Sequence, residues 1–155
     1  MRDVDEDEFY QKIPTLREQG VSDRAILRTI HFFNDNRRAV VLKDALKNGD
    51  FEEFKKVIIE SGRSSLQCLQ NVYAASNPQE QGLTLALALT EKILGGKGAF
   101  RVHGGGFAGT IQAFVPNDVL YAYKEEIEKV FGKGKCYVLS IRPVGGVEVT
   151  PTLFD

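Results

Sequence analysis

The sequence lacks an excess of charge of either sign. Its overall charge is therefore too small to hold a strongly charged partner such as nucleic acid or an anionic membrane. Its 20 basic and 21 acidic residues leave a net charge of −1. A protein that holds nucleic acid or an anionic membrane through its overall field needs a strongly basic balance. We therefore expect no nucleic-acid and no membrane partner, and function must reside in a local site.

Cysteines and long apolar runs are also scarce. Cys68 and Cys136 stand far apart, with no Cys or His beside them at metal-ligand spacing, so we expect free thiols, no metal site and a reducing compartment. The longest apolar stretch, Leu83–Leu89, is interrupted by Thr84 and is too short to span a bilayer. The acidic start has no feature of a secretion signal. The expected location is the cytoplasm.

Only two histidines are present, His31 and His103, and neither has a serine or cysteine motif near it in the sequence. A hydrolase of the serine or cysteine type needs a nucleophile and a base that meet. The sequence predicts no such constellation, so we expect no hydrolase chemistry and assign no catalytic residue.

The first half of the chain carries the start and stop signals of helices. Capping side chains precede apolar residues at helical spacing, and glycines follow them. The third predicted helix is apolar nearly all round, which predicts burial on more than one side. The expected helices run from Ser22 to Gly49, from Asp50 to Gly62 and from Asn77 to Gly95.

After Gly96 the pattern becomes strand-like. We expect strands over residues 99–103, 110–115, 135–142 and 147–149, with a helix from Asn117 or Asp118 to Gly132 between the second and the third. Helices followed by an antiparallel sheet with a crossing helix predict the α+β class, as two layers with the sheet packed on helices and a helical N-terminal half. No linker or repeat divides the chain, so residues 1–155 should form a single domain.

A cluster of glycines lies between the first two predicted strands. Gly104, Gly105 and Gly106 are followed by Phe107 and Gly109. Consecutive glycines have a conformational cost that is tolerated where a positive φ or a close approach to a ligand is needed, and successive bare N–H groups form a concave site for an anion such as phosphate. The lysine of a P-loop is absent. A flexible hairpin turn is the alternative interpretation.

Two polar residues adjoin this cluster on the strand that leads into it. His103 could hydrogen-bond a substrate hydroxyl or a phosphate oxygen, although a satisfied strand-end histidine is the plainer interpretation. Arg101 alternates with Ala99 on one face of the strand, leaving Phe100 and Val102 on the other. The Arg101 face is a candidate functional face.

These residues resemble a known family. The run GGKGAFRVHGGGFAGTIQAFVP, Gly95–Pro116, resembles the third conserved motif of the galactokinase branch of the GHMP small-molecule kinases, in which a strand leads into GGGFGG and a second strand ends in Val-Pro. The flanking segments resemble the family over most of the chain. The sequence departs from the usual pattern at His103, Ala108 and Thr110, where the family has Thr or Ser, Gly, and a small residue that is often Cys.

The resemblance implies a GHMP C-terminal domain fold, a variant of the ferredoxin-like split βαβ arrangement. It implies transfer of the ATP γ-phosphoryl group to a sugar hydroxyl with Mg²⁺, converting galactose to galactose 1-phosphate. The loop His103–Gly109 would lie near substrate and phosphate. The GLSSSA-type phosphate loop and the catalytic residues of the family belong to its N-terminal half, which this chain lacks, so the chain alone should be inactive.

Two partners follow from this interpretation: the enzyme's own N-terminal half and a small-molecule sugar, with a homodimer as another way to cover the docking surface. A rival function is a non-catalytic module that binds a small metabolite or acts in regulation, since fold alone does not decide function. An exposed apolar surface would favour the kinase interpretation, and a polar surface would favour the module.

Overall fold

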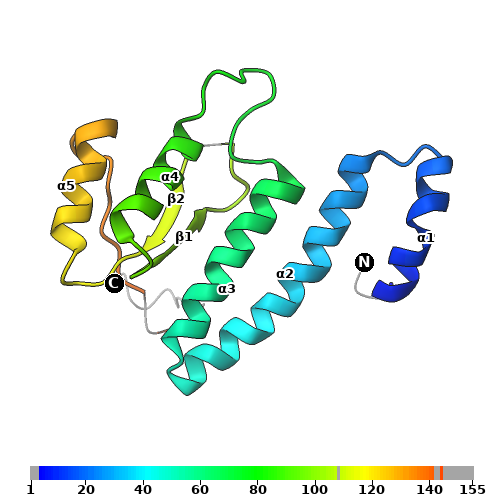
Figure 1. Cartoon of the computed structure of the whole chain (residues 1–155), viewed down its shortest axis with the longest axis horizontal. Helices are drawn as coiled ribbons and strands as arrows, with labels where there is room; N and C mark the ends of the chain where they lie inside the picture. The colour runs from blue at the N-terminus through cyan, green and yellow to red at the C-terminus, as the bar shows by residue number, and fades with distance from the viewer. Residues whose placement is uncertain (1–3, 108, 142–143, 145–155) are drawn as a thin grey trace, which may run out of the picture.

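The computed structural model describes residues 4–107, 109–141 and 144. This part of the chain contains five α-helices, one π-helical turn and a two-stranded antiparallel sheet (Figure 1). The predicted α+β class is therefore confirmed, with helix as the dominant element. Both cysteines are free thiols, as predicted, and Cys68 is buried. Among the described residues, no helix is both long enough and apolar enough to cross a membrane.

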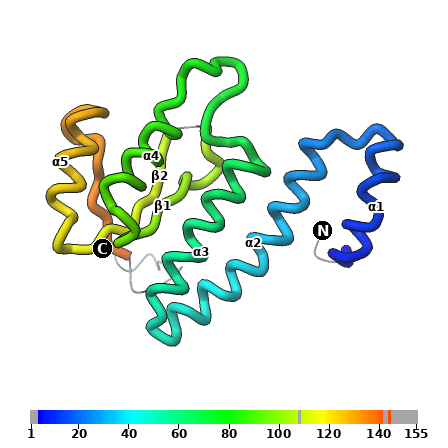
Figure 2. The backbone as a smooth tube through the Cα atoms, in the orientation of Figure 1, coloured from blue at the N-terminus to red at the C-terminus, as the bar shows by residue number. Residues whose placement is uncertain are grey.

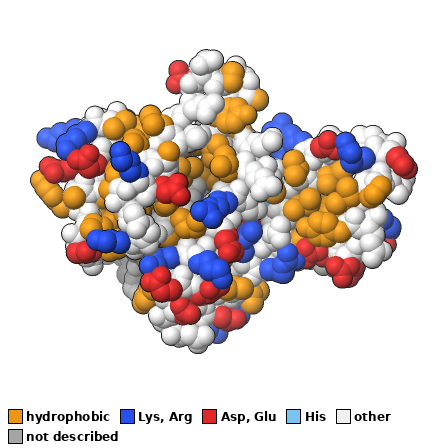
Figure 3. Space-filling model, in the orientation of Figure 1, with side chains coloured by type: hydrophobic (Ala, Val, Ile, Leu, Met, Phe, Trp, Pro, Cys, Tyr) orange, Lys and Arg blue, Asp and Glu red, His pale blue; other side chains and the backbone are white. Residues whose placement is uncertain are grey.

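Helices α1 (Glu6–Glu18) and α2 (Asp23–Asn48) form a hairpin at one end of the molecule, where α1 lies at the outer edge and α2 packs beside the helix that follows it (Figures 1 and 2). The sequence patterns predicted α2 and missed α1. The hydroxyl of Ser22 accepts a hydrogen bond from the Ala25 N–H at 3.3 Å, and Gly49 ends α2 with φ of 68°. Hydrophobic side chains gather between the two helices, with Phe9 and Phe33 buried (Figure 3).

Helix α3 (Phe51–Ser64) begins as predicted, because the Asp50 carboxylate accepts a hydrogen bond from the Glu53 N–H at 3.0 Å. The predicted end at Gly62 is wrong. The helix continues to Ser64 and then through the π-helical turn η1 (Ser65–Leu69). Gly62 serves packing instead: a Cβ there would lie 3.0 Å from the Cβ of Arg101, so the missing side chain lets the sheet approach the helix.

Strands β1 (Ala99–Val102) and β2 (Ile111–Phe114) form the sheet, within one residue of the predicted bounds. One face of this hairpin lies against α3. There Arg101 contacts Gly62, and the rings of Phe54 and Phe114 meet edge to face with centroids 4.9 Å apart.

Helices α4 (Gly82–Leu94) and α5 (Leu120–Phe131) cover the other face. Phe100 joins the buried cluster of Leu94 and Tyr123, and the Tyr123 hydroxyl lies 2.9 Å from that of buried Thr90. The sheet therefore has helices on both faces, which corrects the predicted two-layer arrangement. The reason is that α3 occupies the Arg101 face, which the sequence analysis left open for function.

Other expectations fail in detail. Helix α4 begins at Gly82 rather than after Asn77, because residues 77–81 form turns, and Leu85 on α4 is 49% exposed rather than buried. Neither Asn117 nor Asp118 caps α5. Residues 135–141 form no strand, since this segment has no ladder among the described residues. Residue 142 and the predicted strand over 147–149 lie outside the described residues.

Replacing Gly62 by alanine tests the close approach of α3 and β1. Alanine is intrinsically better in a helix by roughly 1 kcal/mol, but here its Cβ would press on Arg101 and on the Phe100 carbonyl oxygen at 3.3 Å. We expect Gly62→Ala to lower the free energy of unfolding by about 1–3 kcal/mol, measured by urea denaturation. Gly82→Ala is the control, because nothing lies within 4 Å of its Cβ position. A Gly62→Ala variant as stable as the Gly82→Ala variant would contradict this packing.

Candidate functional site

The glycine cluster forms the connection between β1 and β2, as predicted. At its base the His103 N–H donates a hydrogen bond to the Thr110 carbonyl at 3.1 Å. Gly104, Gly106 and Gly109 have φ of 60°, 74° and 90°, values that side chains with a Cβ rarely adopt. Phe107 shares this conformation with φ of 49°. The described part of the loop therefore has positive φ at four residues, three of which are glycines.

Asn71, which follows η1 and is 2% exposed, holds the tip of this loop. Its carbonyl oxygen accepts the Phe107 N–H at 2.9 Å, and its side-chain Nδ2 donates to the Gly105 carbonyl at 3.2 Å. A Cβ on Gly106 would stand 2.1 Å from the Asn71 carbonyl oxygen, so only glycine fits at this position. The sequence analysis missed Asn71, because an isolated asparagine carries no spacing signal.

The other side of the loop is open. No atom lies within 4 Å of the Cβ positions of Gly104 and Gly105, and their N–H groups make no hydrogen bond to the described residues. His103 is exposed, and Phe107 is 50% exposed. These neighbouring N–H groups, beside an exposed imidazole, can donate hydrogen bonds to an anion or to a hydroxyl-bearing ligand.

Arg101, the remaining predicted site residue, is engaged with α3 and η1 rather than with the loop. Its guanidinium donates to the hydroxyls of Ser61 and Ser65 and to the Val102 carbonyl. It also lies 3.9 Å from the carboxylate of Asp35 on α2. These contacts occupy guanidinium N–H groups that would otherwise be available to an anionic ligand. The structure therefore makes Arg101 a link between β1 and the helices.

Asp35 is the centre of a second polar cluster, which the sequence analysis missed. Its carboxylate accepts hydrogen bonds from Ser61 at 2.7 Å and from Arg38 at 3.1 Å, and His31 Nε2 lies 3.4 Å away. The Nδ1 of the same imidazole is 2.9 Å from the Ser64 hydroxyl. The signal was available, because the histidine, aspartate and arginine lie four and three residues apart on one helix face.

The sequence analysis predicted no constellation of serine and histidine, and the fold brings Ser64 and His31 together from positions 33 residues apart. Ser64, His31 and Asp35 have the atom types of a hydrolase triad, yet the serine is buried, with only 7% of its surface exposed. Burial lowers the pKa of His31, with Arg101 and Arg38 acting in the same direction and Asp35 opposing them. We assign the cluster a packing role between α2 and α3.

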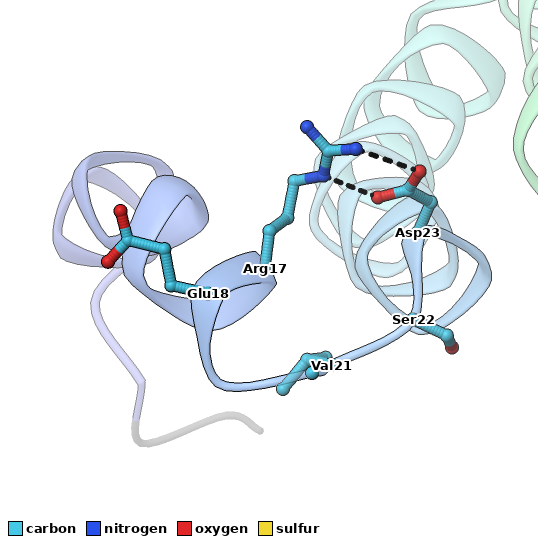
Figure 4. Close-up of a pocket in the computed structure, with 6 residues that line it drawn as sticks. Arg17, Glu18, Val21, Ser22 and Asp23 are labelled. Atoms are coloured by element: carbon cyan, nitrogen blue, oxygen red, sulfur yellow. Dashed lines mark hydrogen bonds and ion pairs between the residues drawn. The ribbon is translucent and has the colours of Figure 1, made fainter.

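Two hollows on the surface lie away from the loop. The first, at the turn between α1 and α2, contains an ion pair in which Arg17 Nε and Asp23 Oδ1 are 2.7 Å apart (Figure 4). Both side chains are exposed and neutralise each other, so the hollow has little to offer a charged ligand. The second lies along α3 and carries mixed charges; its lining includes Lys55, Arg63, Glu91, Gly96 and Phe100.

Comparison with known proteins finds sequence similarity to a galactokinase. No family model matches the chain. The chain is 26% identical over 133 residues to a galactokinase of Glaesserella parasuis serovar 5 (strain SH0165). The aligned residues are 86% of this chain and 32% of the relative, so the chain spans about a third of the length of the curated relative it matches. The chain is galactokinase-like in sequence over most of its length, and a stretch this long includes the glycine loop.

The lowered pKa of His31 predicts a pH dependence of stability. Below about pH 6.5 the unfolded chain binds a proton at this residue, whereas the folded chain resists it until its lower pKa is reached. The free energy of unfolding should therefore fall between about pH 7 and about pH 5.5. We expect His31→Gln to reduce this loss and the exposed His103→Gln control to retain it, measured by urea denaturation at both pH values. Equal losses in the two variants would contradict the assignment.

A pair of alanine substitutions tests the shape of the loop. Gly106→Ala places a Cβ against the Asn71 backbone at a positive φ, so we expect it to lower the free energy of unfolding by about 1–3 kcal/mol. Gly105→Ala enters open space without a positive φ and should change it by less than about 0.5 kcal/mol. Chemical denaturation measures both. If the two variants are equally stable, the loop does not pack on Asn71 as described.

Proposed function

We propose that this chain is the C-terminal part of a galactokinase-like sugar kinase of the GHMP class, which transfers the γ-phosphoryl group of ATP to a hydroxyl of galactose. The observation that carries the proposal is the glycine loop: its sequence resembles the third motif of that family, and the N–H groups of Gly104 and Gly105 beside His103 make no hydrogen bond to the described residues. The similarity to a bacterial galactokinase over 86% of the chain supports the same conclusion.

The loop contributes to this reaction by positioning and by charge stabilisation. Phosphoryl transfer depends almost wholly on these two effects, because the transferred group spreads negative charge over its oxygens. The N–H groups of Gly104 and Gly105 would donate to a phosphate oxygen or to the sugar, and His103 would hydrogen-bond the same ligand. Preorganised backbone donors are effective in this role, since they need no reorganisation as charge develops.

ATP would supply the phosphoryl group, and Mg²⁺ would neutralise part of its charge. The described residues contain no group of three His, Cys, Asp or Glu side chains that could hold a metal ion. We therefore assign no step of the reaction to a metal held by this part of the chain. Its own role is confined to the loop and to the residues that support it.

Exposed apolar side chains support the expectation that further protein covers this chain. They are large, and several are more than half exposed, which is costly if they face only water. Among them are Phe51 on α3, Leu85 on α4, Phe107 in the loop, and Tyr137, Val138, Leu139 and Ile141 on the segment after α5. The N-terminal half of the kinase is the proposed partner for this surface.

The test is enzymatic. The native-length protein that contains this chain should release ADP from ATP and Mg²⁺ only when galactose or a related sugar is present, with sugar phosphate as the second product. The 155-residue chain alone should show no sugar-dependent ADP release above background. A native-length protein that binds a small metabolite but forms no sugar phosphate would overturn the proposal and leave the non-catalytic module in its place.

A further inference from the structure

Asn71 is the only residue outside the loop that we find bonded to its tip, among the residues that the structure describes. It contacts three consecutive loop residues: it bonds Gly105 through its side chain and Phe107 through its backbone, and it packs against Gly106. Asn71 itself is only 2% exposed, whereas the loop residues that it bonds are exposed. The contacts fix the loop on its inner side and leave its outer side open.

The side-chain amide of Asn71 has one bonded end and one unbonded end. Its Nδ2 must face the Gly105 carbonyl, since the opposite orientation would set two acceptor oxygens against each other. Its Oδ1 is buried and has no hydrogen-bond partner among the residues that the structure describes. Buried amide oxygens are nearly always paired, so an unpaired one calls for an explanation.

The residue type follows from this geometry. Aspartate would direct a second acceptor at the Gly105 carbonyl, and alanine would leave that carbonyl without its donor. Asparagine supplies the donor, and as a consequence its Oδ1 stays unpaired among the described residues. The bond to the Gly105 carbonyl therefore accounts for the residue type at position 71.

We propose that Asn71 is the positioning residue of the glycine loop: it holds Gly105 and Phe107 so that the N–H groups of Gly104 and Gly105 face the ligand. It acts through the loop and is not itself catalytic. The role of the loop in a reaction rests on the proposed function, whereas the contacts by which Asn71 fixes the loop do not.

The first measurement needs no variant. Hydrogen exchange of the wild-type chain should show the Phe107 amide protected by its bond to Asn71 and the Gly104 amide exchanging at the rate of an unstructured peptide. Asn71→Ala should then speed exchange at Phe107 at least about tenfold while the amides of β1 and β2 keep their rates. An unprotected Phe107 amide in the wild type would overturn the proposal.

The second measurement is kinetic and uses the native-length protein with ATP and galactose. Asn71→Ala should lower kcat roughly 10- to 100-fold, because small misplacements of positioning groups have effects of this size. The KM for ATP should change less than about threefold, since the loop N–H groups remain present. Asn77→Ala is the matched control: Asn77 is exposed, lies in the same connection and bonds through its backbone only, so both constants should keep their wild-type values.

The outcomes separate the two proposals. If the wild-type enzyme phosphorylates no sugar, the proposed function fails and hydrogen exchange alone decides the role of Asn71. An unchanged kcat in Asn71→Ala overturns the role in the reaction, whether or not exchange at Phe107 rises. If Asn71→Ala does not fold, Gly106→Ala replaces it, because it forces the loop off an intact Asn71. A Gly106→Ala enzyme with wild-type kcat then overturns the proposal.

Discussion

The close packing of β1 on α3 at Gly62 is the contact on which the rest of the structure depends. It brings the Cα atoms of a helix and a strand together where a side chain would keep them apart. The same contact places the Arg101 guanidinium among the hydroxyls of Ser61 and Ser65, so that hydrogen bonds reinforce the packing. A partly buried arginine needs such partners, because an unpaired charge there would be costly.

Helix α3 therefore supports the glycine loop at two points, its base and its tip. Through Gly62 it fixes β1, which leads directly into His103 and the loop base. Through its continuation η1 it delivers Asn71 to the loop tip. The residue that follows the π-helical turn, Gln70, has φ of 52°. This left-handed conformation turns the chain so that Asn71 meets the loop tip. A helix stopping at Gly62 would have provided neither support.

Sequence patterns predicted some of the local elements, missed others such as α1, and predicted the long-range contacts poorly. The caps at Ser22 and Asp50 and the β1–β2 hairpin were correct, because each depends on a few neighbouring residues. Gly62 was misread as a helix stop, since a glycine that permits close packing looks the same in sequence as one that ends a helix. The loop was found by its glycines, whereas Asn71 lies 34 residues from Gly105 and had no local signal. The His31 cluster joins α2 to Ser61 and Ser64 on α3, so the helical spacing of His31, Asp35 and Arg38 indicates only one half of it.

A structure of the native-length protein with galactose and a non-hydrolysable ATP analogue tests the central claim most directly. The account predicts a ligand oxygen within about 3 Å of the Gly104 or Gly105 nitrogen, with the Asn71 carbonyl still bonded to the Phe107 N–H. A nucleotide and sugar bound elsewhere, with the loop still facing solvent, would contradict it.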